Sequence, residues 1–189
     1  MAVEGRSAGG LLVGAAINRA PDVFCAAVGA VPFLDAAGTL QDATLPLTAN
    51  EWEEFGNPNE AKGLESVMGF SPVHNVRQGV RYPRMLLLPA LNDARTGFWE
   101  ALKFAHAIRT NGYNAEWQGV EGSDESACAG SEATGSKTTG SSQAVYVSMD
   151  LEGGHFRSAD PVERAKQRGK ELGFLLAALR HRILRGPAL

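Results

Sequence analysis

The hydrophobic pattern of this chain alternates between buried helical segments and short buried strands. The run from Ala8 to Asn18 is almost wholly small and apolar, which predicts a helix that is buried on most of its faces. The apolar runs 23–33, 84–91 and 144–150 are short and rich in aliphatic residues, as is typical of strands in a parallel sheet. Pro89 lies late in the second of these runs and predicts either an edge strand or a bulge.

Two more helices follow from the periodicity of the second half of the chain. Apolar residues at helical spacing between residues 98 and 108 predict an amphipathic helix. A final helix is predicted to begin with Asp160 as N-cap, Pro161 at its first position and Glu163 completing a capping box. The apolar stripe expected on this helix comprises Leu172, Leu175, Leu176, Leu179 and Ile183. Residues 34–79 contain several turn signals, and we expect one or two short helices there.

Helices and strands that alternate in this way predict an α/β fold, a parallel sheet with helices on both faces. A length of 189 residues allows one domain with a substantial core. Residues 121–143 are rich in glycine, serine and threonine, and we expect a flexible low-complexity insertion at that point.

Composition excludes several classes of function. The net charge of −3 and the pI near 5.8 give no global attraction to nucleic acid or to an anionic membrane. No apolar run is long enough for a membrane-spanning helix. Cys25 and Cys128 show neither metal-ligand spacing nor a disulfide framework, which favours free thiols in a reducing compartment. We therefore expect a cytoplasmic protein without a bound metal or organic cofactor.

Three residues with catalytic chemistry are expected at strand ends. Ser7 lies in the G-x-S-x-G pattern of a hydrolase nucleophile elbow, between residues 1–4, which can at best be the tail of a strand, and the start of a helix. Asp93 follows the run 84–91, and His155 follows the run 144–150. Because active sites of α/β sheets form beyond the carboxyl ends of the strands, we expect all three residues at one edge. Their chain order of serine, aspartate and histidine is the order found in α/β-hydrolases.

These residue types match the requirements of acyl transfer. A serine hydroxyl is a weak nucleophile until a base takes its proton, and the pKa of histidine near neutrality suits that base. A carboxylate fixes the imidazole tautomer, and the backbone N–H of Ala8 is the natural donor to an oxyanion. Each signal alone is weak, because G-x-S-x-G often occurs by chance. Asp150 could end its strand as a solvated charge, and we prefer Asp93 because its position matches that of the acid.

Six stretches resemble a known family. They are "EGRSAGGLL", "RAPDVFCAAVGAVPFLD", "LPLTANEWEEFGNPNE", "SPVHNV", "LNDARTGFWEALKFAHAIR" and "GGHF". Together they resemble the C-terminal part of the catalytic domain in the prolyl oligopeptidase family of serine peptidases, closest to its oligopeptidase B group. The resemblance implies an α/β-hydrolase fold with Ser7 as nucleophile, Asp93 as orienting acid and His155 as base. It implies no cofactor.

The resemblance also implies how substrate is bound. The acids that match Glu51 and Glu53 hold a basic side chain on the acyl side of the scissile bond, and Arg95 matches an arginine that holds a substrate carbonyl. A guanidinium presents donors in a planar fork that carboxylates accept well. An extended backbone would point Glu51 and Glu53 to the same side. The expected activity is therefore cleavage of short peptides after arginine or lysine through an acyl-enzyme.

Two alternatives remain open at this point. One is another α/β-hydrolase such as an esterase, which would show no preference for basic substrates. The other is a catalytically inactive, truncated fragment. The resemblance places a β-propeller, early strands of the sheet and a second oxyanion donor before residue 1. We therefore expect residues 1–189 to form a partial hydrolase domain that is insoluble or molten, and without activity, when expressed alone.

Overall fold

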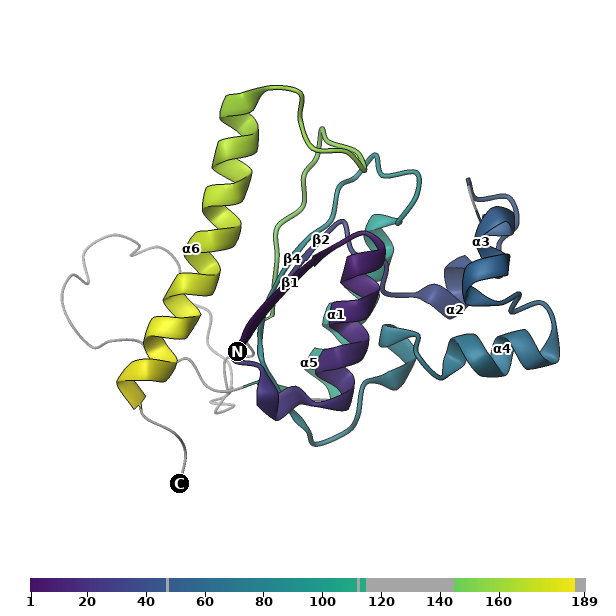
Figure 1. The fold of residues 1–189 in the computed structure, drawn as a ribbon, viewed down its shortest axis with the longest axis horizontal. Helices are drawn as coiled ribbons and strands as arrows, with labels where there is room; N and C mark the ends of the chain where they lie inside the picture. The colour runs from purple at the N-terminus through teal and green to yellow at the C-terminus, as the bar shows by residue number, and fades with distance from the viewer. Residues whose placement is uncertain (47, 112, 115–144, 186–189) are drawn as a thin grey trace, which may run out of the picture.

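The computed structural model describes residues 1–46, 48–111, 113–114 and 145–185 of the chain. The insertion predicted at 121–143 lies outside the described residues. The main feature of the fold is a four-stranded parallel sheet in the order β1-β2-β4-β6 (Figure 1). Its strands are β1 (Ala2–Arg6), β2 (Ala26–Ala30), β4 (Arg84–Leu88) and β6 (Val145–Val147).

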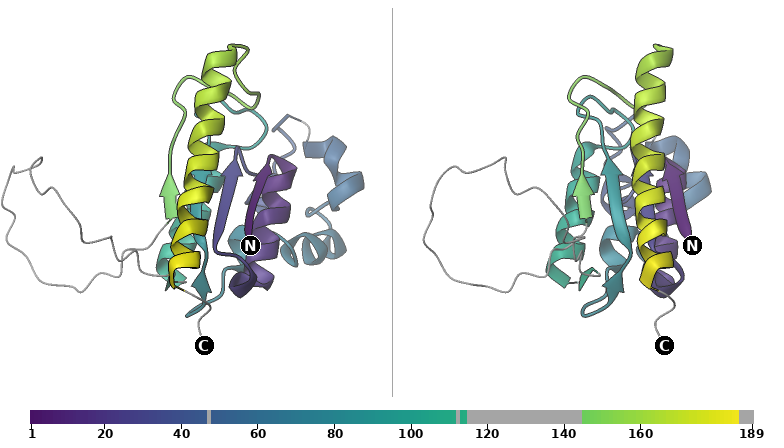
Figure 2. Two further views of the ribbon diagram at one scale, coloured as in Figure 1. Left: turned by 60° about the vertical axis from the view of Figure 1, so that its left-hand side comes forward. Right: turned by 90° about the vertical axis from the view of Figure 1, so that its left-hand side faces the viewer.

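Helices cover both faces of this sheet. Helices α1 (Ala8–Arg19) and α5 (Phe98–Asn111) lie on one face, and the long helix α6 (Pro161–Arg185) lies across the other (Figures 1 and 2). Each of α1 and α5 connects two parallel neighbouring strands, which is the usual crossover connection. The α/β architecture predicted from the alternating pattern is therefore confirmed.

The segment after β2 contains more helix than the sequence predicted. Helices α2 (Ala36–Thr39), α3 (Thr48–Phe55) and α4 (Ala61–Met68) form an arm that extends past α1, on the side away from α6 (Figure 1). The arm has its own apolar cluster, in which Phe33 and Leu40 pack with aromatic side chains of α3. Smaller elements complete the fold: η1 (Pro21–Val23), η2 (Pro72–Asn75), and the paired strands β3 (Arg81–Tyr82) and β5 (Tyr113–Asn114).

The central core lies between the sheet and the helices α1 and α5. Ile17, Met85, Phe104 and Ile108 are all almost completely buried there. Burial of α1 is narrower than the sequence predicted, because Leu12 on its outer side is 69% exposed. No described helix is long and apolar enough to span a membrane.

The strands differ from expectation in two places. Of residues 1–4, expected at best as the tail of a strand, residues 2–4 belong to β1, a five-residue strand that pairs along its whole length with β2, from Ala2 opposite Ala26 to Arg6 opposite Ala30. Pro89 marks no edge strand, since β4 pairs with β2 on one side and β6 on the other. Because proline has no N–H, β4 ends at Leu88, directly before Pro89. Pairing resumes after the proline, at a parallel bridge between Ala90 and Asp150.

The prediction for the start of α6 is confirmed only in part. The Asp160 carboxylate accepts a hydrogen bond from the backbone N–H of Val162 at 2.9 Å, as an N-cap does. Glu163 does not close a capping box but instead pairs with Lys166 at 2.7 Å.

The apolar stripe predicted on α6 holds only in part: Leu175 and Leu179 are half-buried, and the side chain of Ile183 lies outside the described residues. Leu172 and Leu176 are 41% and 65% exposed, whereas Glu171 and Ala178 are buried. The small side chain of Ala178 allows close approach to the sheet, and the Glu171 carboxylate is paired with Arg168 at 2.8 Å. The α6 face that meets the sheet therefore combines a buried alanine and a buried, paired acid with half-buried apolar side chains, and periodicity does not reveal the first two.

Candidate active site

Ser7 occupies a sharp turn between β1 and α1. Its backbone angles are φ 52° and ψ −124°, a conformation that non-glycine residues rarely adopt. Hydrogen bonds hold the turn in place: the Ser7 N–H donates to the Ala30 carbonyl at 3.1 Å, and the Phe33 N–H donates to the Ser7 carbonyl at 3.1 Å. Such strain at a strand-to-helix turn is the geometry of a nucleophile elbow.

Gly5, two residues before Ser7, makes this turn sterically feasible. A Cβ atom on Gly5 would lie 2.1 Å from the Gly9 carbonyl oxygen, so no larger residue fits. Ala8 is the first residue of α1 and is exposed. Its N–H has no partner within the helix, as is general for the first turn, and it lies at the positive end of the helix dipole.

Asp93 lies in the loop between β4 and α5 and is fixed from several directions. Its side chain is 0% exposed. One carboxylate oxygen accepts the backbone N–H groups of Arg95 at 2.8 Å and Thr96 at 2.9 Å, and the Thr96 hydroxyl lies 3.0 Å from the other. The loop therefore presents the carboxylate in a single orientation.

His155 contacts this carboxylate directly. Its Nδ1 atom lies 2.9 Å and 3.1 Å from the two oxygens of Asp93, and its side chain is 9% exposed. Asp150, the rival acid, faces elsewhere: its carboxylate accepts the N–H groups of Glu152 and Gly153 and so closes the turn that leads to His155. An imidazole held through Nδ1 in this way presents its Nε2 as the free base.

The structure joins two of the three predicted residues by a side-chain hydrogen bond and places the third on the same edge. Among the described residues, the Ser7 hydroxyl makes no hydrogen bond. A different contact connects the elbow to the histidine loop. The side chain of Arg6, directly before Ser7, donates a hydrogen bond to the main-chain carbonyl of His155.

The two acids Glu51 and Glu53 do not lie as expected. Both belong to α3, and residues two apart in a helix point in nearly opposite directions rather than to one side. Glu51 is half-buried, whereas Glu53 is exposed. The expectation of two parallel carboxylates rested on an extended backbone and is wrong.

Burial and neighbouring charges both affect the pKa of the Glu51 carboxyl. Burial raises the pKa of the Glu51 carboxyl, and the charge of Glu54 adds to this effect. The positive charges of Arg95 and His155 act in the opposite direction on the pKa of Glu51. Glu51 therefore lies within electrostatic range of the histidine.

An aromatic side chain and a cation flank the histidine. Phe156 is 73% exposed, and its ring packs edge-on against the ring of His155 with 5.7 Å between centroids. The guanidinium carbon of the exposed Arg95 lies 5.1 Å from the centroid of the Phe156 ring. This contact is a cation–π interaction at the rim of the site.

Sequence reasoning missed Arg6 and Thr96. Arg6 is half-buried, and burial lowers the pKa of its guanidinium. It lines a cavity of about 570 Å³ between the sheet edge and α6, together with Phe156 and Arg157. The available signal was position: a charged residue inside the G-x-S-x-G pattern and a threonine three residues after the candidate acid.

A second group of serine, histidine and aspartate is unsuited to nucleophilic catalysis. Ser71 and Asp35 both face the same ring nitrogen of His74, at 2.9 Å and 3.7 Å, instead of opposite nitrogens. Ser71 is 0% exposed and already accepts the N–H of Ala37. In the described parts of the chain, no group of histidine, cysteine or acidic side chains could hold a metal ion.

Comparison with known proteins identifies the family. The sequence profile of the prolyl oligopeptidase family matches residues 1–134. The chain belongs to the prolyl oligopeptidase family, and its sheet and helices form part of an α/β-hydrolase fold. The profile covers Ser7 and Asp93 and ends before His155.

Similar proteins in sequence are peptidases by name. Protease 2 of Moraxella lacunata is 41% identical over 109 residues, which cover 58% of this chain and 16% of that protein. Dipeptidyl aminopeptidase BI of Pseudoxanthomonas mexicana is 39% identical over 109 residues, or 58% of this chain and 15% of that protein. The matched segment thus spans less than a fifth of the length of these relatives.

Solved structures extend the likeness over nearly the whole chain. Oligopeptidase B from Leishmania major superposes with a TM-score of 0.76 at 33% identity, covering 95% of this chain and 21% of that protein. Oligopeptidase B from Trypanosoma brucei, with covalently bound antipain, gives a TM-score of 0.74 at 36% identity, with the same coverage.

Proposed function

We propose that the chain provides the catalytic residues of a serine peptidase that cleaves short peptides after arginine or lysine. The observation that carries this proposal is the buried Asp93–His155 pair on the same sheet edge as the strained elbow of Ser7. The peptidase names of its relatives, among them two oligopeptidases B, support the same reaction class.

Acylation follows from these positions. Nε2 of His155 takes the hydroxyl proton of Ser7 as the Ser7 oxygen attacks the peptide carbonyl carbon. The carbonyl oxygen becomes an oxyanion, which the N–H of Ala8 stabilises at the end of α1. Asp93 accepts the Nδ1–H and stabilises the imidazolium. When the peptide C–N bond breaks, His155 returns the proton to the leaving amine and the acyl group stays on Ser7.

Deacylation uses the same groups in the same order. His155 takes a proton from water, the hydroxide attacks the acyl carbon, and the ester bond to Ser7 breaks as His155 returns the proton to the serine oxygen. No metal or organic cofactor enters either step.

The basic preference is assigned chiefly to Glu51. Glu51 is half-buried and lies within electrostatic range of His155, so a substrate guanidinium near the scissile bond would find its counter-charge there. Glu53, exposed on another side of α3, is proposed only as a weaker, longer-range contributor. Arg95 is proposed to hold a substrate carbonyl, since its guanidinium lies at the rim beside His155 and Phe156.

The triad is tested with Ser7→Ala and His155→Ala. All activity measurements here and below use the natural gene product, expressed with whatever sequence its gene places before residue 1 and after residue 189. We expect each variant to lose kcat/KM for an arginyl peptide amide by several orders of magnitude. A fluorophosphonate should label Ser7 in the wild type, as located by peptide mass mapping. Labelling of another residue, or near-wild-type turnover in either variant, would contradict the assignment.

A further inference from the structure

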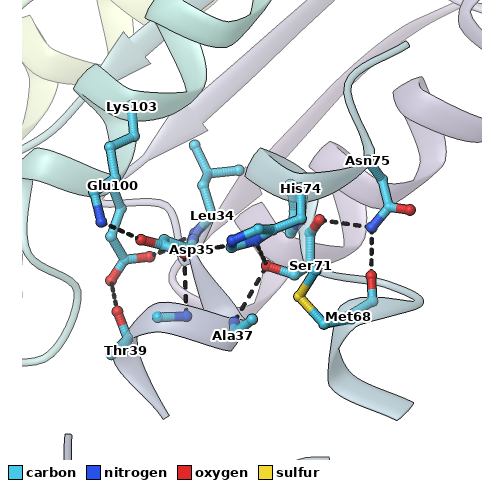
Figure 3. Close-up of polar contacts among 12 residues, drawn as sticks. Leu34, Asp35, Ala37, Thr39, Met68, Ser71, His74, Asn75, Glu100 and Lys103 are labelled. Carbon is cyan, nitrogen blue, oxygen red and sulfur yellow. Dashed lines mark hydrogen bonds and ion pairs between the residues drawn. The ribbon is translucent and has the colours of Figure 1, made fainter. Parts of the chain in front are cut away.

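A second buried carboxylate lies seven residues after Asp93. Glu100, in the first turn of α5, is 0% exposed. One of its oxygens accepts the backbone N–H groups of Leu34 at 2.7 Å and Asp35 at 2.8 Å, and the other lies 2.9 Å from the Thr39 hydroxyl (Figure 3). These partners lie at the two ends of α2, so one side chain of α5 holds the whole of that short helix.

Hydrogen bonds connect the end of α2 directly to α3. The indole N–H of Trp52 donates to the carbonyl of Leu40 at 2.9 Å, one residue beyond Thr39. The Thr48 hydroxyl lies 3.5 Å from the Thr39 carbonyl. Trp52 is the residue next to Glu51. A continuous set of hydrogen bonds therefore runs from Glu100 through the end of α2 to the helix that contains Glu51.

The segment that Glu100 holds is strained at its start. Val31, directly after β2, has φ 39°, which is unfavourable for a β-branched residue. Thr96 lies 2.9 Å from the Val31 carbonyl at this end, and Glu100 binds Leu34 and Asp35 three and four residues later. Contacts from the loop and first turn of α5 thus fix both ends of the path from the sheet to the arm.

Glu100 forms no ion pair among the described residues, because the nearby cation pairs with Asp35 instead. Asp35, whose side chain is 3% exposed, takes the nearby ammonium of Lys103 at 2.5 Å and faces His74 at 3.7 Å (Figure 3). Glu100 bonds only to N–H and hydroxyl donors among the described residues. Its hydrogen bonds therefore hold the segment around α2 and neutralise no positive charge.

We propose that Glu100 is a positioning residue for substrate selection, which holds α2 and through it the helix α3 that contains Glu51. This inference rests on the proposed role of Glu51 in binding the basic side chain. The elbow of Ser7 is secured mainly by pairing of β1 with β2 and by the Ser7–Ala30 hydrogen bond, and only its bond from the Phe33 N–H borders the segment that Glu100 holds. Loss of Glu100 should therefore change which substrate binds more than how fast a bound substrate reacts.

The test compares an arginyl peptide amide with the same peptide containing citrulline, the uncharged isostere of arginine. Glu100→Ala should raise KM for the arginyl substrate roughly tenfold relative to the citrulline substrate, while kcat on citrulline stays within about threefold. Glu100→Gln should restore most of the preference, because an amide oxygen accepts the two N–H groups and its NH2 can donate to Thr39. Glu65→Gln, an exposed acid on α4, is the matched control and should behave as wild type.

Two further variants distinguish failure of the proposed specificity from failure of the positioning role of Glu100. Glu51→Gln with an unchanged arginine-to-citrulline ratio would overturn both the proposed specificity and this inference. If Glu51→Gln lowers the ratio but Glu100→Ala lowers kcat/KM equally for both substrates, the function stands and the positioning role falls. Should Glu100→Ala fail to fold, Thr39→Val removes one Glu100 contact alone, and an unchanged ratio in that variant would also overturn the inference.

Discussion

Asp93 and Glu100 are two buried carboxylates built from nearly the same parts. In each carboxylate, one oxygen accepts the backbone N–H groups of two consecutive residues. The second oxygen of each lies next to a threonine hydroxyl. They differ in the next neighbour. Asp93 faces the imidazole of His155 at 2.9 Å, whereas Glu100 has no titratable partner in contact among the described residues.

Because of that difference, similar hydrogen bonds can serve different functions at the two carboxylates. A carboxylate held rigidly against an imidazole can stabilise a proton on that ring, which acyl transfer needs. A carboxylate held by backbone N–H groups and a hydroxyl, without an imidazole, fixes the position of the chain it binds, and its own pKa becomes sensitive to burial. Under the proposed function, one loop and the first turn of one helix would supply both the chemistry and the support of the site.

Replacement of the acid beside the imidazole should have the largest effect. Asp93→Asn retains shape but places an amide against Nδ1, so we expect kcat to fall by roughly 10³–10⁴ through loss of the correct tautomer. Asp150→Asn is the matched control, because that carboxylate only closes a turn, and it should keep kcat within about fivefold. Equal losses in both variants, measured as kcat on an arginyl amide, would remove the distinction between the two aspartates.

Protonation of Glu100 should appear in the pH dependence of stability. Burial raises the pKa of Glu100 from 4.5 to about 7, against the opposing effect of the Asp35 and Leu34 N–H groups and the Thr39 hydroxyl, while the charge of Asp35 raises it further. The folded state therefore binds this proton more tightly than the unfolded state. The resulting stabilisation is complete below pH 4.5 and is lost as the pH rises through about 7.

Glu100→Gln cannot titrate and isolates this contribution. Between pH 5 and pH 8 the wild type should lose about 2–3 kcal/mol of unfolding free energy relative to this variant, measured by urea unfolding. Glu65→Gln serves as the surface control and should follow the wild type. Parallel pH profiles for wild type and Glu100→Gln would show that Glu100 has an ordinary pKa in the folded protein.

The two acids of α3 should separate in a specificity assay. Glu51→Gln removes a half-buried charge near His155, so we expect the arginine-to-citrulline ratio of kcat/KM to fall roughly 10- to 100-fold. Glu53→Gln, on an exposed position of the same helix, should change that ratio less than about threefold. A larger effect from Glu53 would mean that α3 presents a different face to substrate.

Much of the fold followed from local patterns in the sequence. The buried strands of the sheet produce continuous apolar runs, and the Asp160 cap produces a clear helix start. The α6 stripe was predicted only in part, because contact with the sheet also depends on shape and ion pairing, which place Glu171 inward and Leu176 outward. Short helices were expected within residues 34–79, but the helix at 48–55 was not located, because tertiary contacts of Trp52 and Phe55 stabilise it.

The site was predictable to the extent that its residues follow strands. Ser7, Asp93 and His155 were located because the carboxyl ends of parallel strands share one edge. Glu100 was not, because in the sequence it is one polar residue on an amphipathic helix, where acids are ordinarily exposed. Its burial depends on Leu34 and Asp35, which are more than sixty residues away in the chain.

The smallest effect should come from the two hydroxyls that accompany the two carboxylates. The Thr96 hydroxyl lies 2.9 Å from the Val31 carbonyl, 3.0 Å from Asp93 and 3.4 Å from Nδ1 of His155. Thr96→Val removes this hydrogen-bonding group at constant volume, and a hydrogen bond worth about 1 kcal/mol implies a loss in kcat of roughly fivefold. Thr39→Val, which removes the equivalent group beside Glu100, should leave kcat on the citrulline substrate within about twofold. Thr96→Ser restores the hydroxyl and should restore kcat. If Thr39→Val instead lowers kcat on both substrates as much as Thr96→Val does, the two carboxylates act on the same step, and their division between chemistry and support is wrong.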